Sequence, residues 1–309
     1  MITYENCQLC GHKCGIDRRI AKGKCHSDAT PRVCRADLHL WEEPPITGEK
    51  GSGTIFFSGC SLGCVFCQNY EISRGCVGQS VTDSELVRLM LNLQGRGASN
   101  INFVTPTHFI PTLAKVIPEA KKCGLTLPIV YNTSSYERVE SLRMLDGLVD
   151  IYLPDYKYAD ARLAEKYSGV RDYPEVARAA IDEMVRQCPS LIFSDTDTYS
   201  PSSEHSEKTK LLLSGVVCRV LVLPGAIANS SLAISHLYRT YGDRIFISIL
   251  GQYTPVGTLP SPLDRKISAG EYRRVVEYAE RLGVKNAFVQ SLSVAEESFI
   301  PNFFEKLPL

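Results

Sequence analysis

The sequence predicts an α/β fold in which a curved, incomplete barrel of six strand-helix units follows a small cysteine-rich segment. Two observations support this prediction. Short apolar runs alternate with amphipathic stretches from residue 54 onward, and 309 residues suffice for one large core. Such alternation indicates a parallel sheet covered by helices, although periodicity alone does not separate a barrel from an open sheet. We expect a cysteine-rich metal-binding module and linker in residues 1–47, and the barrel with a C-terminal extension in residues 48–309.

Each unit is expected to begin with an apolar strand and to continue into a helix. The expected strands are 54–59, 100–105, 128–134, 149–156, 216–224 and 244–253, with 286–291 as a further edge strand. After the first strand, Thr82 or Asp83 is a suitable N-cap for a helix with apolar residues at helical spacing. A helical region is expected from about 159 to 188. Residues 189–212 are rich in Ser, Thr, Asp and Pro and predict a long surface loop.

The charge balance and the cysteine content limit the classes of function. The 34 basic and 34 acidic residues cancel, which argues against a broad cationic face for nucleic acid or membrane surfaces. No stretch approaches 18 apolar residues and the first residues lack a signal-peptide pattern, so we expect a cytoplasmic protein. Twelve cysteines in such a chain, clustered as C-x-x-C, indicate metal or redox chemistry rather than disulfides.

Three cysteines lie directly after the first expected strand. Cys60, Cys64 and Cys67 have the spacing C-x3-C-x2-C, at the strand end where barrel enzymes place their chemistry. Three thiolates hold three irons of a 4Fe-4S cluster and leave the fourth iron open to an exogenous ligand. The alternatives are a chance spacing, or Cys76 as an ordinary fourth ligand.

This cysteine spacing, with the aromatic Phe66 before the last cysteine, resembles the signature of the radical S-adenosylmethionine (radical SAM) superfamily. The resemblance implies that S-adenosylmethionine chelates the open iron and is reductively cleaved to a 5′-deoxyadenosyl radical, which abstracts a hydrogen atom. It also implies an external electron donor of the flavodoxin or ferredoxin type. The stretch GSGTIFFSGCSLGCVFCQNYEIS resembles a branch related to the pyruvate formate-lyase activating enzyme.

The resemblance to this branch implies further cofactor-binding residues at other strand ends. Asp155 and Lys157 in LPDYK match an Asp-x-Lys at the end of the fourth strand, in contact with S-adenosylmethionine. Arg219 in CRVLVLPG resembles an arginine that reaches the cofactor carboxylate. Asn132 and Thr133 in YNTSS resemble an Asp-Thr near the same site. Without the resemblance, these residues are also consistent with ion pairs at the barrel mouth.

The sequence departs from that branch in two places. The Gly-Gly-Glu that receives the cofactor amino group is replaced by VTPTHF, in which Thr105, Thr107 or His108 is the candidate substitute, although a lone histidine is often structural. The cysteine-rich ferredoxin-like insertion of many glycyl-radical activators is also missing. The resemblance therefore carries over the radical-generating half of the activity. At the sixth strand end, Gln252 and Tyr253 are candidates for substrate contact, and Tyr253 is the candidate catalytic hydrogen-atom relay, with simple packing as the alternative.

Four more cysteines lie near the amino terminus, in a segment too short and polar to hold a core of its own. Cys7, Cys10, Cys14 and Cys25 provide four soft ligands with two tight spacings. This set suits structural zinc or a fully ligated auxiliary iron-sulfur cluster, and thiolate affinity does not choose between them. Reduced thiols without metal remain the third interpretation.

The stretch LHLWEEPPITGEKGSG, residues 38–53, joins this segment to the first strand. Its two prolines are typical of a rigid linker, with Trp41 packed against the barrel. The alternative interpretation places Glu42 or Glu43 in the substrate site.

Three classes of function follow. The first is a radical SAM enzyme that removes a hydrogen atom from a glycyl residue of a partner protein or from a smaller substrate. The second is a non-enzymatic iron-sulfur electron carrier, which needs neither six strand-helix units nor an open iron. The third is a zinc-ribbon module for nucleic acid, which the zero net charge and the absence of interleaved basic and aromatic residues disfavour.

Overall fold

The computed structural model describes residues 3–74, 77–200, 208–292, 303 and 307–308. Cys76 lies outside these ranges. The strands of the described part are β1 (Arg32–His39), β2 (Ser52–Phe57), β3 (Gln79–Ser80), β4 (Ile101–Val104), β5 (Ile129–Thr133), β6 (Ile151–Pro154), β7 (Ile192–Tyr199), β8 (Lys208–Leu221), β9 (Phe246–Leu250) and β10 (Ala287–Val289). The α-helices are α1 (Pro44–Thr47), α2 (Tyr70–Arg74), α3 (Asp83–Gly95), α4 (Ile110–Lys122), α5 (Val139–Leu142), α6 (Ala161–Ser168), α7 (Tyr173–Gln187), α8 (Ile227–Tyr241) and α9 (Ala269–Leu282).

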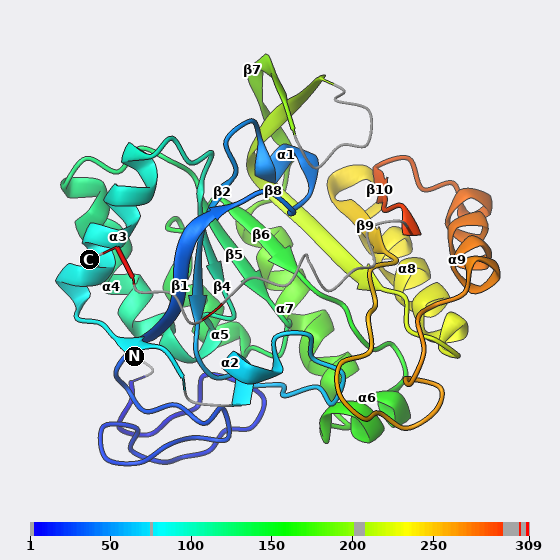
Figure 1. Ribbon diagram of the computed structural model, residues 1–309, viewed down its shortest axis with the longest axis horizontal. Coiled ribbons are helices and arrows are strands. Elements are labelled where there is room, and N and C mark those ends of the chain that lie inside the picture. Colours follow the sequence, from blue (N-terminus) through cyan, green and yellow to red (C-terminus); the bar gives the residue numbers. More distant parts are fainter. Residues whose placement is uncertain (1–2, 75–76, 201–207, 293–302, 304–306, 309) are drawn as a thin grey trace.

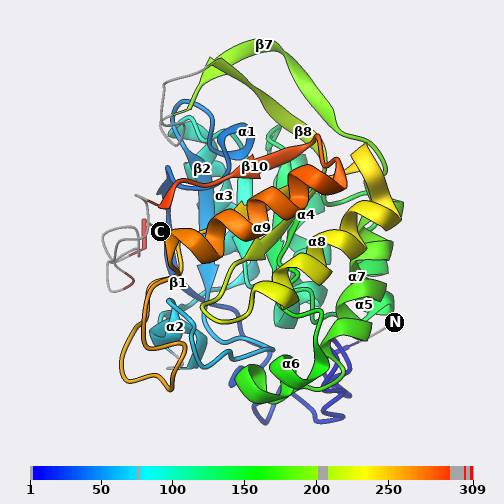
Figure 2. The ribbon, with the colours of Figure 1, turned by 90° about the vertical axis from the view of Figure 1, so that its right-hand side faces the viewer.

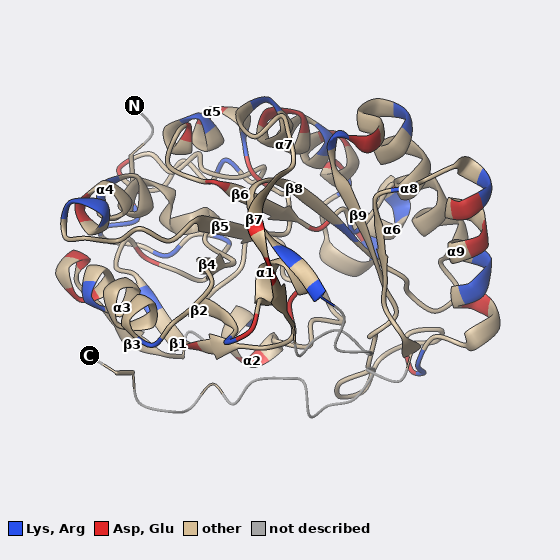
Figure 3. Cartoon of the chain, turned by 90° about the horizontal axis from the view of Figure 1, so that it is seen from above, with Lys and Arg blue, Asp and Glu red and all other residues tan. Residues whose placement is uncertain are grey.

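One sheet carries the fold, with the strand order β10-β9-β8-β6-β5-β4-β2-β1-β3. The neighbours from β2 to β10 in this order pair in parallel, as expected from their continuous apolar runs. The longer helices lie in an arc outside the sheet (Figure 3). The α/β partial barrel predicted from the sequence is therefore confirmed, including the seventh, edge strand β10.

The helices begin where the sequence indicates. Thr82 is the N-cap of α3, since its side chain accepts a hydrogen bond from the backbone of Glu85, whose side chain accepts from the Thr82 backbone in return. The expected helical region 159–188 is divided into α6 and α7, because Gly169 takes a left-handed conformation that ends α6.

The prediction of a surface loop over residues 189–212 is wrong. Residues 192–199 and the first part of β8 form an antiparallel hairpin that projects beyond the end of the sheet (Figure 2). The polar composition suggested a loop, but a two-stranded ribbon that is largely exposed on both faces needs few apolar residues.

The amino-terminal segment is joined to the barrel rather than standing apart. Residues 32–39, which the sequence placed in the cysteine-rich module, form β1 and pair antiparallel with β2. Leu9 is buried in the same apolar cluster as the barrel strands. The fully buried Arg18 donates to the backbone carbonyls of Ser27, Asp28 and His108, so it ties the segment to the barrel. No helix in the described ranges is long and apolar enough to cross a bilayer.

Candidate active site

The partial barrel encloses a cavity of about 580 Å³. This volume lies within the range of roughly 300 to 1,000 Å³ that is common for small-molecule sites. Its lining brings together all residues that the sequence predicted for the iron-sulfur site in the barrel and for S-adenosylmethionine. These residues are Cys60, Cys64, Phe66, Cys67, Asn132, Thr133, Asp155, Lys157 and Arg219. Gln252, Tyr253, Glu42 and Glu43 line the same cavity.

The cysteine loop depends on a glycine at its start. Gly59 has φ of +88°, and a Cβ there would lie 2.2 Å from the Ser27 hydroxyl oxygen and 2.5 Å from the Cys25 carbonyl oxygen. The loop can therefore lie against the amino-terminal segment, where the Cys60 amide donates to the Cys25 carbonyl at 3.2 Å. Burial raises the pKa of the Cys60 thiol to about 12, and the nearby Cys67 adds to this shift. Without a bound cation the Cys60 thiol stays protonated, and binding a metal would release its proton.

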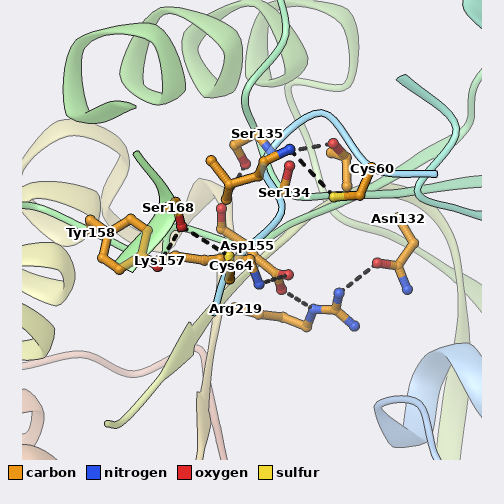
Figure 4. Close-up of polar contacts among 12 residues, drawn as sticks. Cys60, Cys64, Asn132, Ser134, Ser135, Asp155, Lys157, Tyr158, Ser168 and Arg219 are labelled. Carbon is orange, nitrogen blue, oxygen red and sulfur yellow. Dashed lines mark hydrogen bonds and ion pairs between the residues drawn. The ribbon is translucent and has the colours of Figure 1, made fainter. Parts of the chain in front are cut away.

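A hydroxyl chain from α6 reaches the middle cysteine of the loop. The Ser168 hydroxyl donates to the Cys64 sulfur at 3.2 Å, and the Tyr158 and Ser168 hydroxyls lie 2.8 Å apart (Figure 4). Within the described ranges, no three His, Cys, Asp or Glu side chains form a preassembled metal-binding group. Ligation by Cys60, Cys64 and Cys67 therefore stays a prediction, for which the lining of the cavity supplies the ligands.

Beside the cysteines, alternating charges form a chain across the strand ends (Figure 4). The Lys157 ammonium donates to Asp155 Oδ2 at 2.6 Å, and Arg219 Nε donates to Asp155 Oδ1 at 2.7 Å. Arg219 also donates to Asn132 Oδ1 at 2.5 Å and to Glu42 Oε2 at 3.2 Å. Burial alone would raise the pKa of Asp155, but Arg219 and Lys157 outweigh it and hold that pKa below its usual value. The structure thus brings together on one surface the four residues predicted from three different strand ends.

The candidates for the missing Gly-Gly-Glu fall into two groups. Thr107 donates to Glu137 at 2.5 Å, and a His108 ring nitrogen is bonded to the Ser58 carbonyl at 2.7 Å, so both side chains are already engaged. Thr105 lines the cavity and has φ of +56°, a conformation that non-glycine residues seldom adopt. Thr133 also lines the cavity, although its hydroxyl donates to Glu137.

Aromatic packing surrounds Phe66, the residue before the last cysteine of the loop. Phe66 lies edge-on to Tyr158, Tyr167 and Tyr253, with ring centroids 6.1 to 6.3 Å apart. The Tyr253 hydroxyl donates to the Leu263 carbonyl at 2.6 Å, a contact that favours the packing interpretation of this residue over the relay. A catalytic role for Tyr253 remains a prediction.

The amino-terminal cysteines lie close to one another beneath the cysteine loop. Cys7, Cys10 and Cys25 are buried and Cys14 is half-buried. A Cβ on Gly23 would lie 3.4 Å from the Cys25 sulfur and 3.8 Å from the Cys14 sulfur, so these two sulfurs face the same glycine. Burial is the main cause that raises the pKa of Cys10, and the other three thiols add to it. A metal here also remains a prediction.

Sequence reasoning missed three polar residues of the site. Ser134 lines the cavity, and its buried hydroxyl has no hydrogen-bond partner among the described residues. Asn102 donates to Glu42 at 2.9 Å from inside β4. The third is Ser168, described above. Asn102 was detectable, because a polar residue between the apolar Ile101 and Phe103 indicates a strand face turned toward a polar interior.

The curved parallel sheet, the three thiols after its first parallel strand and the adjoining ion pairs define an α/β-barrel protein with a candidate cofactor site at the strand ends. Residues 54–196 match the family model of the Radical SAM superfamily. This superfamily uses a 4Fe-4S cluster and S-adenosylmethionine. The residues present fit both groups, since three thiols, fixed charges and the unpartnered Ser134 hydroxyl line one cavity.

Comparison with known proteins gives a similar relative and similar folds. Uncharacterized protein MJ0674 of Methanocaldococcus jannaschii is 25% identical over 289 residues, which cover 90% of this chain and 75% of the relative. The structure of HydG, a maturase of the FeFe-hydrogenase, matches with a TM-score of 0.52 and 15% identity over 80% of this chain. The matched part spans about half of HydG, 54% of that chain. Methylornithine synthase (PylB) matches with a TM-score of 0.48 and 14% identity, over 76% of this chain and 70% of that chain.

Proposed function

We propose that this chain is an enzyme that reductively cleaves S-adenosylmethionine and removes a hydrogen atom from a substrate held in the same cavity. The observation that carries this proposal is the shared lining of one cavity by Cys60, Cys64 and Cys67 and by the chain of charges from Lys157 to Arg219. An electron carrier needs no such cavity beside its cluster.

Each group of residues has a distinct role in the proposal. The three loop cysteines hold three irons, which leaves one iron for the amino and carboxylate groups of S-adenosylmethionine. Arg219 and Lys157 provide positive charge for the carboxylate, while Asn132, Thr133 and Ser134 offer polar contacts. Thr105 is the proposed replacement for Gly-Gly-Glu, through its carbonyl or hydroxyl oxygen. Phe66 packs beside the cofactor.

When bound, the cluster and S-adenosylmethionine supply a 5′-deoxyadenosyl radical. The chemistry would consume one electron from an external donor and one S-adenosylmethionine, would release methionine and 5′-deoxyadenosine, and would leave the substrate one hydrogen atom poorer. We propose a flavodoxin or ferredoxin as the donor and a reducing cytoplasmic setting, which suits buried free thiols. A branch related to the pyruvate formate-lyase activating enzyme, with a glycyl residue of a partner protein as substrate, is one form of this proposal. A small-molecule substrate is the other.

The test is anaerobic reconstitution with iron and sulfide, followed by dithionite reduction in the presence of S-adenosylmethionine. We expect the full-length protein to release 5′-deoxyadenosine, measured by liquid chromatography. A protein that holds four irons and four sulfides at the loop but releases none would contradict the proposal. The Tyr253→Phe variant should still cleave S-adenosylmethionine, and loss of substrate turnover alone would identify a relay.

We also propose that Cys7, Cys10, Cys14 and Cys25 bind zinc or a second iron-sulfur cluster. Their segment directly supports the cysteine loop, because the Cys60 amide and the Ser58 carbonyl both form hydrogen bonds with this segment. Metal analysis of the reconstituted protein distinguishes the cases, with four irons and one zinc in the first and up to eight irons in the second. A Cys10→Ser variant that keeps the full metal content would contradict a metal at this segment.

A further inference from the structure

The short helix α1 brings two neighbouring carboxylates into the cavity from the end opposite the cysteine loop. The backbone carbonyl of Glu43 accepts from the amides of Ile46 and Thr47, and the Thr47 hydroxyl donates to the Glu42 carbonyl at 2.8 Å. These bonds hold residues 42–47 across the end of the sheet. In Figure 1, α1 lies at one end of the parallel strands and α2, which follows the cysteine loop, lies at the other.

The two carboxylates differ in their partners. Glu42 accepts hydrogen bonds from Asn102 and Asn132 and pairs with Arg219, so it belongs to the charge network. Glu43 is 7% exposed, and neither of its carboxylate oxygens accepts a well-formed hydrogen bond among the described residues. Burial is the dominant cause and raises the pKa of Glu43, while the positive charge of Arg219 and, more weakly, Ser248 lower it. A buried carboxylate without a hydrogen-bond partner destabilises a folded protein, which points to an absent partner.

The charges of the cavity leave this carboxylate uncompensated. Among the described lining residues, the carboxyl side chains are Glu42, Glu43 and Asp155, whereas the only basic side chains that stay charged are Lys157 and Arg219. His39 is neutral at physiological pH, because burial lowers its pKa to about 4. Among the described residues, the cavity therefore has one carboxyl group more than it has cations to pair with.

The apolar part of the cavity lining indicates what else the missing cation carries. The cavity is also lined by the apolar side chains of Phe56, Leu221, Leu250 and Phe288. Such walls suit a hydrocarbon body better than they suit a strongly hydrated inorganic cation. We propose that Glu43 binds the protonated amine of a small organic substrate whose apolar part lies against these walls. The identification of this ligand as the substrate rests on the proposed radical SAM function.

The amino group of S-adenosylmethionine is the other possible source of such a cation, and the order of the charges argues against it. Lys157 is near enough to Cys64 and Cys67 for their charges to interact, whereas Glu43 interacts with Arg219 and Glu42 at the far end of the chain. A cofactor anchored at the cysteine loop would meet Lys157 and Asp155 before it reached Glu43.

The experiment compares two probes of equal shape on the full-length, cluster-reconstituted protein under anaerobic conditions. Calorimetric titration measures the binding of n-hexylamine and of n-hexanol to the wild type, Glu43→Gln and Glu49→Gln. Glu49 is the matched control, because it lies in the same connection but is exposed. We expect the wild type and Glu49→Gln to prefer the amine, and Glu43→Gln to bind the amine tenfold to a hundredfold more weakly with little change for the alcohol. S-adenosylmethionine affinity should be equal in all three proteins.

Several results would overturn the inference. These are a wild type that does not prefer the amine, a Glu43→Gln variant that binds it like the wild type, or an equal loss of S-adenosylmethionine affinity in that variant. Should Glu43→Gln fail to fold, Glu43→Met serves instead, and we expect a melting temperature above that of the wild type because an unpaired buried charge is removed. A melting temperature below that of the wild type would count against the inference. Release of 5′-deoxyadenosine by the wild type is scored separately, so that failure of cleavage contradicts only the proposed function.

Discussion

At the cysteine end of the cavity Asp155 is paired with both Lys157 and Arg219, whereas at the α1 end neither carboxylate oxygen of Glu43 has a hydrogen-bond partner among the described residues. The first arrangement keeps charges fixed before any ligand arrives, which suits a cofactor that every turnover requires. In the second arrangement the unpaired carboxylate destabilises the protein until a ligand binds. This suits a substrate, which binds and is released in every turnover. The difference indicates that the two ends of one cavity serve two different ligands.

The largest effect is expected from the cysteine end. Cys64→Ser should abolish release of 5′-deoxyadenosine, by a factor of at least about 10³, since two thiolates cannot hold the cluster with one open iron. The exposed Cys123→Ser is the control and should match the wild type. Iron content and product release measure the effect, and a Cys64→Ser protein that still cleaves S-adenosylmethionine would remove the basis of the comparison.

Arg219 joins the two ends, so its loss should be the most costly for stability. Arg219→Met leaves Asp155 with only Lys157 and leaves the Glu42 carboxylate without a cation. We expect the free energy of unfolding to fall by about 3 to 5 kcal/mol, measured by urea denaturation. Arg281→Met, at a half-exposed ion pair on α9, should change it by less than about 0.5 kcal/mol. Similar losses in the two variants would show that the charge chain is not structural.

Glu137 is a buried carboxyl group outside the cavity lining, and it shows how burial makes the stability of the protein depend on pH. Burial raises its pKa to about 6 from 4.5. Because the folded pKa is the higher one, its contribution to stability is present below pH 4.5 and is lost as the pH rises through 6, which amounts to about 2 kcal/mol. Relative to the wild type, Glu137→Gln should therefore gain about that much between pH 4 and pH 7 in denaturation experiments.

The control for this titration is Glu165→Gln, a substitution at an exposed carboxylate of α6. Its stability should follow the wild type across the same pH range. A Glu137→Gln profile that runs parallel to the wild type would mean that the buried carboxylate titrates normally.

The smallest effect is expected on the reduction potential of the cluster. Ser168→Ala removes the hydroxyl that donates to Cys64, and a hydrogen bond to sulfur favours the more negative, reduced cluster. A contribution of about 1 kcal/mol corresponds to roughly 40 mV for a one-electron couple, so the potential should fall by that amount. A redox titration followed by electron paramagnetic resonance measures it. Tyr158→Phe should give a smaller shift of the same sign, and an unchanged potential in Ser168→Ala would contradict this role.

The sequence allowed prediction of the parallel strands and of the cysteine end, because both are encoded locally. An apolar run is visible in six residues, and C-x3-C-x2-C with Phe66 lies within eight. The β7–β8 hairpin was missed because its exposed strands have the composition of a loop. β1 was missed because we assigned residues 32–39 to the cysteine-rich module on the basis of the nearby cysteines.

For Glu42 and Glu43 the sequence left two interpretations open, a rigid linker and a substrate site. Local pattern could not decide between them, since the partners of Glu42 come from β4, β5 and β8. The same holds for Ser168, whose contact with Cys64 joins residues 104 positions apart.

By itself, the sequence determined the fold class, the ligands available for a cluster and the strand ends that carry the charged residues. Spacing and periodicity express these properties over short stretches of chain. Only the tertiary structure decided which charged groups of the described cavity lining are paired and that Glu43 is not. Pairing depends on side chains that are brought together from distant strands. That decision separates Glu42, which belongs to the protein's own network, from Glu43, for which we propose a ligand.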